Sequence, residues 1–285
     1  MSTIRVFFPR RTLGSYKRSL LQSELYLSLR DSYRTRCASY HSPFDNIYHC
    51  CTQRTASQWL RGIFDDARFV KYTGLRTIPY TELGLRYADL HLPFQTRSVV
   101  AHLYVSYPTF ECLPKPEHFF AFFILRDPRD VVTSWYFAAR YSHRLVWPIN
   151  EMREVLAHLN VTDGFNYVID QLDAFGTFEA QRSWVAHATG ETPILRYERI
   201  AADNVAFLTD LFCRMHINMS EPEFRALCEA HSFTTKTHGR QQGEVDDNSH
   251  YRVGIAGDYQ NHFTPAIMAH FRQVTGDTLE ALGYQ

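Results

Sequence analysis

The feature that most constrains the fold is an apolar run that ends in an arginine and leads directly into a helix start. Residues 118–125 (HFFAFFIL) are nearly all apolar, which is typical of a strand covered on both faces of a parallel sheet. Arg126 follows, Asp127 suits a helix N-cap and Pro128 suits the first helical position. The segment therefore predicts a strand, a sharp turn and a helix to about Tyr141.

Further strands and helices alternate along the chain. Strands are predicted at 46–52, 98–105 and 193–197, and helices at 57–67, 180–189, 203–214, 221–231 and 265–282. This order predicts an α/β protein, a single domain with a central parallel β-sheet flanked by helices. With no internal repeat, residues 1–285 are interpreted as one domain, and residues 1–45 as an N-terminal extension packed on it. Ligands in such folds bind at the carboxyl ends of the strands.

Composition excludes several classes of function. The formal net charge is zero, which argues against nucleic-acid or anionic-membrane binding as the main activity. No apolar run approaches the roughly 20 residues that span a bilayer. The six cysteines are scattered without a zinc-binding spacing. We expect a cytoplasmic protein without a membrane anchor; the basic, acid-poor residues 1–23 leave an organellar transit peptide as an alternative.

Three segments place positive charge beside a turn. Arg54 lies in a polar loop that precedes a predicted helix, and helix N-termini attract anions through unpaired N–H groups. Arg126 stands at the strand-to-helix turn described above. Arg252 precedes Gly254 and Gly257, which permit a close approach of backbone to a ligand. The pattern GxxxxGK[ST] of magnesium-dependent nucleotide-binding loops is missing.

The three segments resemble, in order and separation, the signature regions of sulfotransferases that use 3′-phosphoadenosine-5′-phosphosulfate (PAPS). Residues 53–59 (QRTASQW) stand where the family carries PKSGTTW, and residues 126–134 match RDPRDxxxS completely. Residues 252–264 keep most of RKGxxGDWKNHFT. The resemblance implies the P-loop NTPase or nucleotide-kinase-like sulfotransferase fold, PAPS as co-substrate with PAP (3′-phosphoadenosine 5′-phosphate) as product, and no metal.

The resemblance also implies roles for individual residues. Arg54 would contact the 5′-phosphate and stabilise the leaving oxygen, and His102 would be the catalytic base. The 3′-phosphate would be bound by three side chains, and the adenine would be held between two rings with a tyrosine at its edge. The implied cofactor-binding positions are Arg54, Thr55, Ala56, Ser57, Gln58 and Trp59 in the first segment, Arg126 and Ser134 in the second, Tyr197 and Phe233 around the adenine, and Arg252, Val253 and Gly254 in the last.

Several positions depart from the family pattern. Arg54 replaces a lysine, which keeps the charge but substitutes a planar fork for a point charge. Ala56 replaces a flexible glycine. Val100 and Val253 stand where relatives carry cations, and Arg199 replaces an acidic residue. Two alternatives therefore stay open: a nucleotide-dependent phosphotransferase of similar fold, and a catalytically silent PAP-binding protein.

The expected acceptor is a small molecule that presents a hydroxyl or an amine-type nitrogen. Predicted wall residues of its pocket are Tyr104, Tyr107, Phe137, Tyr141, His143 and Trp147. The acidic run 244–247 (EVDD) raises the hypothesis of a cationic acceptor, with a solvated loop as the alternative. Nothing in the sequence decides between a monomer and a homodimer.

Overall fold

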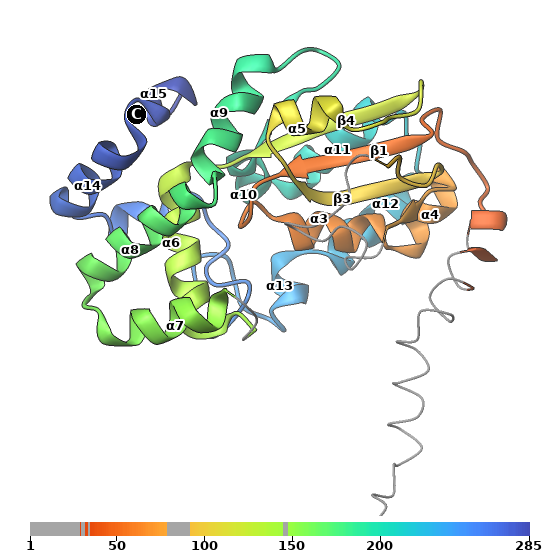
Figure 1. Cartoon of the computed structure of the whole chain (residues 1–285). Helices are drawn as coiled ribbons and strands as arrows, with labels where there is room; N and C mark the ends of the chain where they lie inside the picture. Colours follow the sequence, from red (N-terminus) through yellow and green to blue (C-terminus); the bar gives the residue numbers. More distant parts are fainter. Residues whose placement is uncertain (1–28, 30–31, 34, 79–91, 145–147) are drawn as a thin grey trace, which may run out of the picture.

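A five-stranded sheet forms the centre of the molecule (Figure 1). The computed structural model describes residues 29, 32–33, 35–78, 92–144 and 148–285. The strands are β1 (Asn46–Cys51), β2 (Arg76–Thr77), β3 (Ser98–Tyr104), β4 (Phe119–Leu125) and β5 (Ile194–Arg196), in the order β2-β3-β1-β4-β5. Every neighbouring pair is parallel, so the predicted parallel sheet is confirmed.

Helices cover both faces of this sheet. One face packs on α3 (Ser57–Phe64), α4 (Ala67–Thr73), α11 (Asn204–Arg214) and α12 (Glu221–Ala230), with Ile47 and Phe122 among the buried contacts. The other face packs on α5 (Tyr107–Cys112) and α9 (Thr177–His187), where Trp184 stacks on Phe123 at 4.9 Å between ring centroids. The near-continuous apolar sequence of β1 and β4 follows from burial on both sides.

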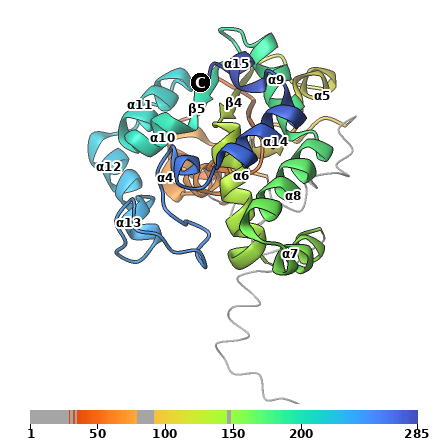
Figure 2. The ribbon, with the colours of Figure 1, turned by 90° about the vertical axis from the view of Figure 1, so that its left-hand side faces the viewer.

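A third group of helices lies beyond the carboxyl ends of the strands (Figures 1 and 2). It comprises α6 (Pro128–Phe137), the π-helix η2 (Ala138–Ser142), α7 (Ile149–His158), α8 (Val161–Ala174), α14 (Pro265–Thr275) and α15 (Thr278–Ala281). These helices share a separate core around Phe165 and Phe271. The remaining elements, α10 (Tyr197–Ala202), α13 (Phe233–Lys236) and the 3₁₀ turn η3 (Asp258–Asn261), lie near the sheet's carboxyl edge or on the loops that approach it.

Helix boundaries differ from the predictions for local reasons. The predicted helix 57–67 ends at Phe64, and a second helix begins at Ala67, where the Asp66 side chain accepts from the Arg68 N–H as the N-cap of α4. The predicted helix 265–282 is interrupted at Gly276, whose φ is +60°. The helix predicted to end near Tyr141 continues beyond Phe137 as a π-helix. The helices at 149–158 and 161–174 were not predicted.

A bulge in β3 changes which side chains face the site. Tyr48 pairs with Val100 but Cys50 pairs with Leu103, so β3 carries one extra residue at this point. His102 adopts the left-handed φ of +48°. The alternation of faces shifts after the bulge, and Tyr104 packs on the same core as α3.

Part of the predicted N-terminal extension is described. Its residues 39–45 run along the sheet: Ser42 donates its N–H to the Thr73 carbonyl at 2.8 Å, and Asp45 donates to the His118 carbonyl at 2.7 Å. The first 28 residues lie outside the described part of the chain, so the extension's full extent stays a prediction. Among the helices that the structure describes, none has the length and apolar character to cross a membrane.

Candidate active site

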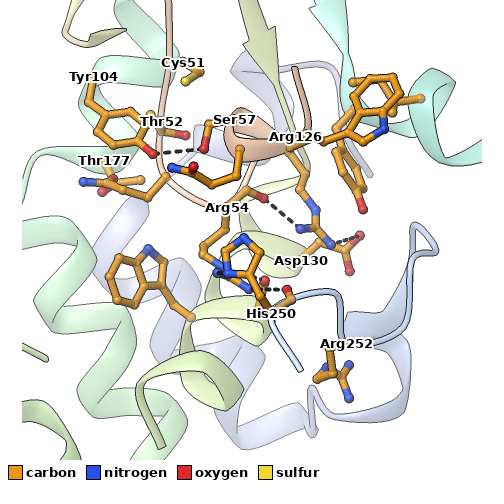
Figure 3. Close-up of a pocket in the computed structure, with 18 of the residues that line it drawn as sticks. Cys51, Thr52, Arg54, Ser57, Tyr104, Arg126, Asp130, Thr177, His250 and Arg252 are labelled. Atoms are coloured by element: carbon orange, nitrogen blue, oxygen red, sulfur yellow. Dashed lines mark hydrogen bonds and ion pairs between the residues drawn. The ribbon is translucent and has the colours of Figure 1, made fainter. Parts of the chain in front are cut away.

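A large cavity lies at the carboxyl ends of β1, β3 and β4 (Figure 3). Its volume is about 880 Å³. The walls combine the loop after β1, the end of β3, the start of α6, the junction of α8 and α9, and the loop that precedes η3. The position agrees with the expectation that ligands of parallel sheets bind beyond the strand ends.

The first predicted segment forms a tight loop between β1 and α3. Arg54 and Ala56 both adopt left-handed backbone conformations, with φ of +65° and +62°. Ala56 is the N-cap of α3 and offers no side-chain cap, so the first amides of that helix depend on other partners. Ser57 and Gln58 line the cavity, but Thr55 does not, because its buried hydroxyl donates to the Thr52 carbonyl at 2.7 Å. The Thr55 hydroxyl, which was predicted to contact the phosphosulfate, therefore points to a backbone carbonyl and does not face the cavity.

The Arg54 guanidinium projects into the cavity. Its Nε donates to the Ser134 hydroxyl at 2.9 Å, and its Nη1 lies 3.4 Å from Nδ1 of His250. Burial, and next the charge of Arg126, lowers the pKa of Arg54 to about 10, so the group stays charged at neutral pH. The contact with Ser134 joins the first and second predicted segments, whereas the contact with His250 was not predicted.

Arg126 occupies the turn between β4 and α6. Its Nη1 donates to the Arg54 carbonyl at 2.8 Å, its Nη2 lies 3.7 Å from Asp130, and its guanidinium sits 4.1 Å from the centre of the Tyr197 ring. The predicted N-cap is confirmed, since Asp127 accepts from the Arg129 N–H at 2.9 Å. Arg126 is 6% exposed, and within the described residues its Nε has no hydrogen-bond partner. A buried guanidinium with a free donor is prepared for an anionic ligand.

The third segment wraps over α6. Asp130 accepts from the backbone N–H groups of Gly257 and Tyr259 at 2.8 and 2.9 Å, which fixes the loop to the helix. Arg252 lines the cavity, but Asp247 and Asp258 form ion pairs with its guanidinium. Figure 3 shows this guanidinium pointing away from Arg54. The structure thus brings Arg54 and Arg126 together and leaves Arg252 in the wall with carboxylate partners.

The rings predicted to hold the adenine line the same cavity. Trp59 is fixed by a hydrogen bond from its Nε1 to the His231 carbonyl at 2.7 Å, and Phe233 and Tyr197 lie in the wall with it. Gly254 has φ of +71°, and a Cβ there would lie 2.5 Å from the Phe233 ring. Only glycine allows that close approach. Val253 also lines the cavity, whereas the lining residues Asn204 and Lys236 were not predicted.

The predicted base His102 does not reach the cavity. It is fully buried in β3 and is not among the lining residues, and burial lowers its pKa to about 3. The bulge at this point places Tyr104 at the strand end instead, where its hydroxyl lies 3.0 Å from the Ser57 hydroxyl. Val100 is likewise buried in the sheet, so its replacement of a family cation leaves no gap in the cavity wall.

The predicted acceptor wall is correct in part. Tyr104 and His143 line the cavity, and the residue at 147 lies outside the described part of the chain. Three other predicted wall residues do not line it: Tyr107 stacks on His187, Phe137 lies under Arg252, and Tyr141 is exposed.

The acidic run 244–247 does not line the cavity either. Asp247 pairs with Arg252, and the Glu244 carboxylate accepts from the Gln241 N–H at 2.8 Å. The side chains that raised the hypothesis of a cationic acceptor thus have local partners and do not face the site. The acidic run 244–247 therefore gives no support to a cationic acceptor.

The fold and the cavity together define an α/β protein with a parallel sheet and a cavity at its carboxyl edge, where the side chains of Arg54 and Arg126 lie beside helix N-termini. The family model of the sulfotransferase domain matches residues 121–283, which is more than half of the chain. The chain therefore belongs to the sulfotransferase family. The match includes Arg126 and Arg252 but begins after the loop of Arg54 and the strand of His102.

Solved structures agree with this assignment at the level of the fold. Mouse sulfotransferase SULT7A1 complexed with PAP is 18% identical, covers 88% of this chain and 90% of its own, and superposes with a TM-score of 0.58. Retinol dehydratase in complex with androsterone and the inactive cofactor PAP is also 18% identical, with coverages of 88% and 85% and a TM-score of 0.52. A comparison with curated protein sequences gives no match.

Proposed function

We propose that this protein transfers a sulfuryl group from PAPS to a hydroxyl or amine-type nitrogen of a small molecule, giving PAP and a sulfated product. The observation that carries the proposal is the pair of guanidinium groups of Arg54 and Arg126, linked through the Arg54 carbonyl, in a cavity that also contains Trp59 and Phe233. Two clustered cations suit phosphate and sulfate oxygens, and the rings suit a flat base.

The residues present fit such a nucleotide. PAPS would supply the activated sulfuryl group. The unpartnered Nε of Arg126 and the buried, unpartnered hydroxyl of Thr52 offer hydrogen bonds that no described residue takes up. Arg54, held by Ser134, would stabilise negative charge on the leaving phosphate oxygen. Positioning and charge stabilisation would supply most of the rate enhancement, as in phosphoryl transfer.

For the acceptor's proton we propose His143 in place of His102. His143 lines the cavity, and its pKa is lowered by burial and further by the charge of Arg54, so the imidazole is neutral at pH 7. Its Nδ1 lies 3.0 Å from the Arg144 carbonyl, which would hold the proton on Nδ1 and leave the Nε2 lone pair available. In-line transfer would then place the acceptor atom between His143 and the sulfur of PAPS, with the leaving phosphate oxygen on the opposite side of the sulfur, beside Arg54. The bond from sulfur to that oxygen would break as the bond to the acceptor forms, and PAP would leave.

The two structural relatives support a small-molecule acceptor, because one of them was crystallised with androsterone and both with PAP. We also infer a cytoplasmic location, which cell fractionation would test. The chain's choice between monomer and homodimer is a separate question that light scattering would answer.

A thermal-shift series with PAP, PAPS and Mg-ATP tests the proposal against its alternatives. A ligand at a hundredfold excess over its Kd stabilises a protein by about 2.7 kcal/mol. We expect a clear shift with PAP and PAPS, and transfer of ³⁵S from labelled PAPS to at least one acceptor in a panel. A shift only with Mg-ATP would favour the phosphotransferase. Binding of PAP without transfer to any acceptor would favour the silent binding protein.

The base is tested by the variants His143→Gln and His102→Gln. General-base catalysis contributes about 10²–10⁴-fold, so we expect that loss in kcat for His143→Gln, with PAP affinity unchanged. If only His102→Gln lost kcat to this extent, His102 and not His143 would be the catalytic base.

A further inference from the structure

The part of the cavity away from the nucleotide residues has its own chemistry. Its walls come from the end of β3, from α6, and from the starts of α7 and α9. They are largely apolar, with Val105, Trp135, Ile149 and Phe175 among the lining residues. We call this region the acceptor compartment. Among the described lining residues from the end of β3 and the starts of α7 and α9, only Glu179 has a formal charge at neutral pH, and it is exposed. Asp130 of α6 lies beside Arg126, on the nucleotide side.

Two residues that line this compartment each have a buried polar side-chain atom without a partner. Within the described residues, neither the Thr177 hydroxyl nor the Trp135 Nε1 makes a hydrogen bond. Thr177 is 3% exposed and Trp135 is 6% exposed, and both residues line the cavity. Figure 3 shows Thr177 among the lining side chains. Because an unsatisfied buried polar group is unfavourable and uncommon, each such atom requires an explanation, and a ligand group is the one that a cavity provides.

A helix start reinforces these two groups. The helix α9, 11 residues long, begins at Thr177, and its N-cap Gly176 supplies no side-chain cap. Gly176 and Ala180 also line the cavity. The first amides of a helix need acceptors from outside the helix. Two unpartnered polar side chains and a helix start without a side-chain cap therefore belong to the wall of one largely apolar compartment.

The donors define the chemistry of the group that they would bind. Indole Nε1 only donates, while a threonine hydroxyl donates or accepts. A carbonyl or hydroxyl oxygen has the two lone pairs needed to accept from both. A carboxylate would also accept, but Glu179 in the first turn of α9 adds negative charge nearby and disfavours an anion.

We propose that the acceptor is an uncharged, largely apolar molecule that carries, besides the group to be sulfated, a remote carbonyl or hydroxyl oxygen bound by Trp135 Nε1 and Thr177 Oγ1. This proposal rests on the proposed sulfuryl transfer for the meaning of "acceptor". The binding site itself is defined by the wall of the cavity and is open to measurement without turnover.

The test uses two probes that differ only in the remote oxygen, 4-acetylbenzyl alcohol and 4-ethylbenzyl alcohol. Their binding to the full chain saturated with PAP is followed by ligand-observed NMR titration. A hydrogen bond that leaves a buried group unpaired when lost is worth about 1–3 kcal/mol, so we expect the acetyl compound to bind at least about fivefold more tightly. Equal affinities for the two probes would overturn the proposal.

Substitutions locate the preference. Thr177→Val and Trp135→Phe each remove one donor, and each is expected to reduce the preference to less than about twofold. Thr133→Val is the matched control, because the Thr133 hydroxyl is buried in α6 with the Arg129 carbonyl as its partner and does not line the cavity. The control is expected to keep the wild-type preference. A preference that survives in both donor variants would also overturn the proposal.

The outcome is separable from that of the proposed function. PAP affinity and ³⁵S transfer are measured on the same four proteins. Loss of PAP binding or of transfer to every acceptor would refute the sulfotransferase proposal, and the probes are then titrated against the protein alone. Intact PAP binding and transfer with no preference between the probes would refute only the acceptor subsite.

Discussion

Gly254 offers a direct test of how the loop and the adenine-holding ring are fitted together. The residue has φ of +71°, and a Cβ added there would lie 2.5 and 2.6 Å from two carbons of the Phe233 ring. Both distances are below any normal contact, so in Gly254→Ala the ring must move. The left-handed conformation costs an alanine about 1–2 kcal/mol in addition.

The displacement of the ring is expected to lower the affinity for PAP, and the strained backbone is expected to lower the stability of the protein. Stacking of a base on an aromatic side chain is worth about 1–3 kcal/mol, so displacement of Phe233 is expected to weaken PAP binding by about 5- to 150-fold. Calorimetric titration with PAP measures this directly. The backbone strain should appear separately, as a lower melting temperature of the protein without ligand.

Gly276→Ala is the matched control. Gly276 also has a positive φ, of +60°, but nothing lies within 4 Å of the position of its Cβ, and it ends α14 away from the cavity. We expect this variant to lose stability and to bind PAP like the wild type. If Gly254→Ala bound PAP with wild-type affinity, the placement of the adenine against Phe233 would be wrong.

Two further predictions concern stability. Burial holds the pKa of His49 well below its usual range and that of His102 at about 3, so both are neutral when folded. The unfolded chain protonates both histidines below about pH 6.5, whereas the folded chain does not. The free energy of unfolding therefore has its full value above that pH and falls by up to about 1.4 kcal/mol per pH unit for each histidine as the pH falls toward 3. Urea unfolding at pH 5 and pH 7 measures this difference in the free energy of unfolding. The variant His102→Asn should show a smaller difference, and asparagine tolerates the left-handed backbone at this position. An equal difference in wild type and variant would contradict the lowered pKa of His102. Asp130→Asn should weaken the link between α6 and the loop at Gly257 and lower stability by about 1–3 kcal/mol, because a buried carboxylate that accepts from two backbone amides is replaced; an unchanged melting temperature would argue against that link.

The second predicted segment could be derived from sequence because every local signal agrees. An apolar run, an N-cap aspartate and a proline at the first helical position fix the end of β4 and the start of α6. These local signals place Arg126 at a helix N-terminus without any information from distant residues. The same logic placed Arg54 before α3, but not its contact with His250, which depends on a loop nearly 200 residues further along.

The burial of His102 away from the cavity has a specific physical origin that the sequence does not reveal. Period-2 alternation assigns a residue to one face of a strand, and one extra residue shifts every later assignment. The sequence VVAHLYV carries no glycine or proline to mark the bulge, so only the pairing of β3 with β1 reveals it. Tyr104 thereby lies at the strand end where the base had been predicted.

The acceptor compartment was the least predictable part of the site. Trp135 directly follows the motif of residues 126–134, but Thr177 begins a helix with no sequence signal beyond the preceding Gly176. Its position in the cavity depends on the packing of α8 on α6 and α14, and on the packing of α9 on the sheet through Trp184. Tertiary packing of this kind leaves no trace in local periodicity.

We propose that Arg126 and its neighbours recognise the phosphates of a doubly phosphorylated adenosine. Calorimetric titration of PAP and of 5′-AMP, which lacks the 3′-phosphate, into wild-type protein and Arg126→Ala measures this recognition. A charge-assisted hydrogen bond contributes about 1.5–3 kcal/mol, so PAP should bind the wild type about 10- to 150-fold more tightly than 5′-AMP, and the variant should lose most of that difference while its affinity for 5′-AMP stays similar. Equal affinity of the wild type for the two nucleotides would contradict the account.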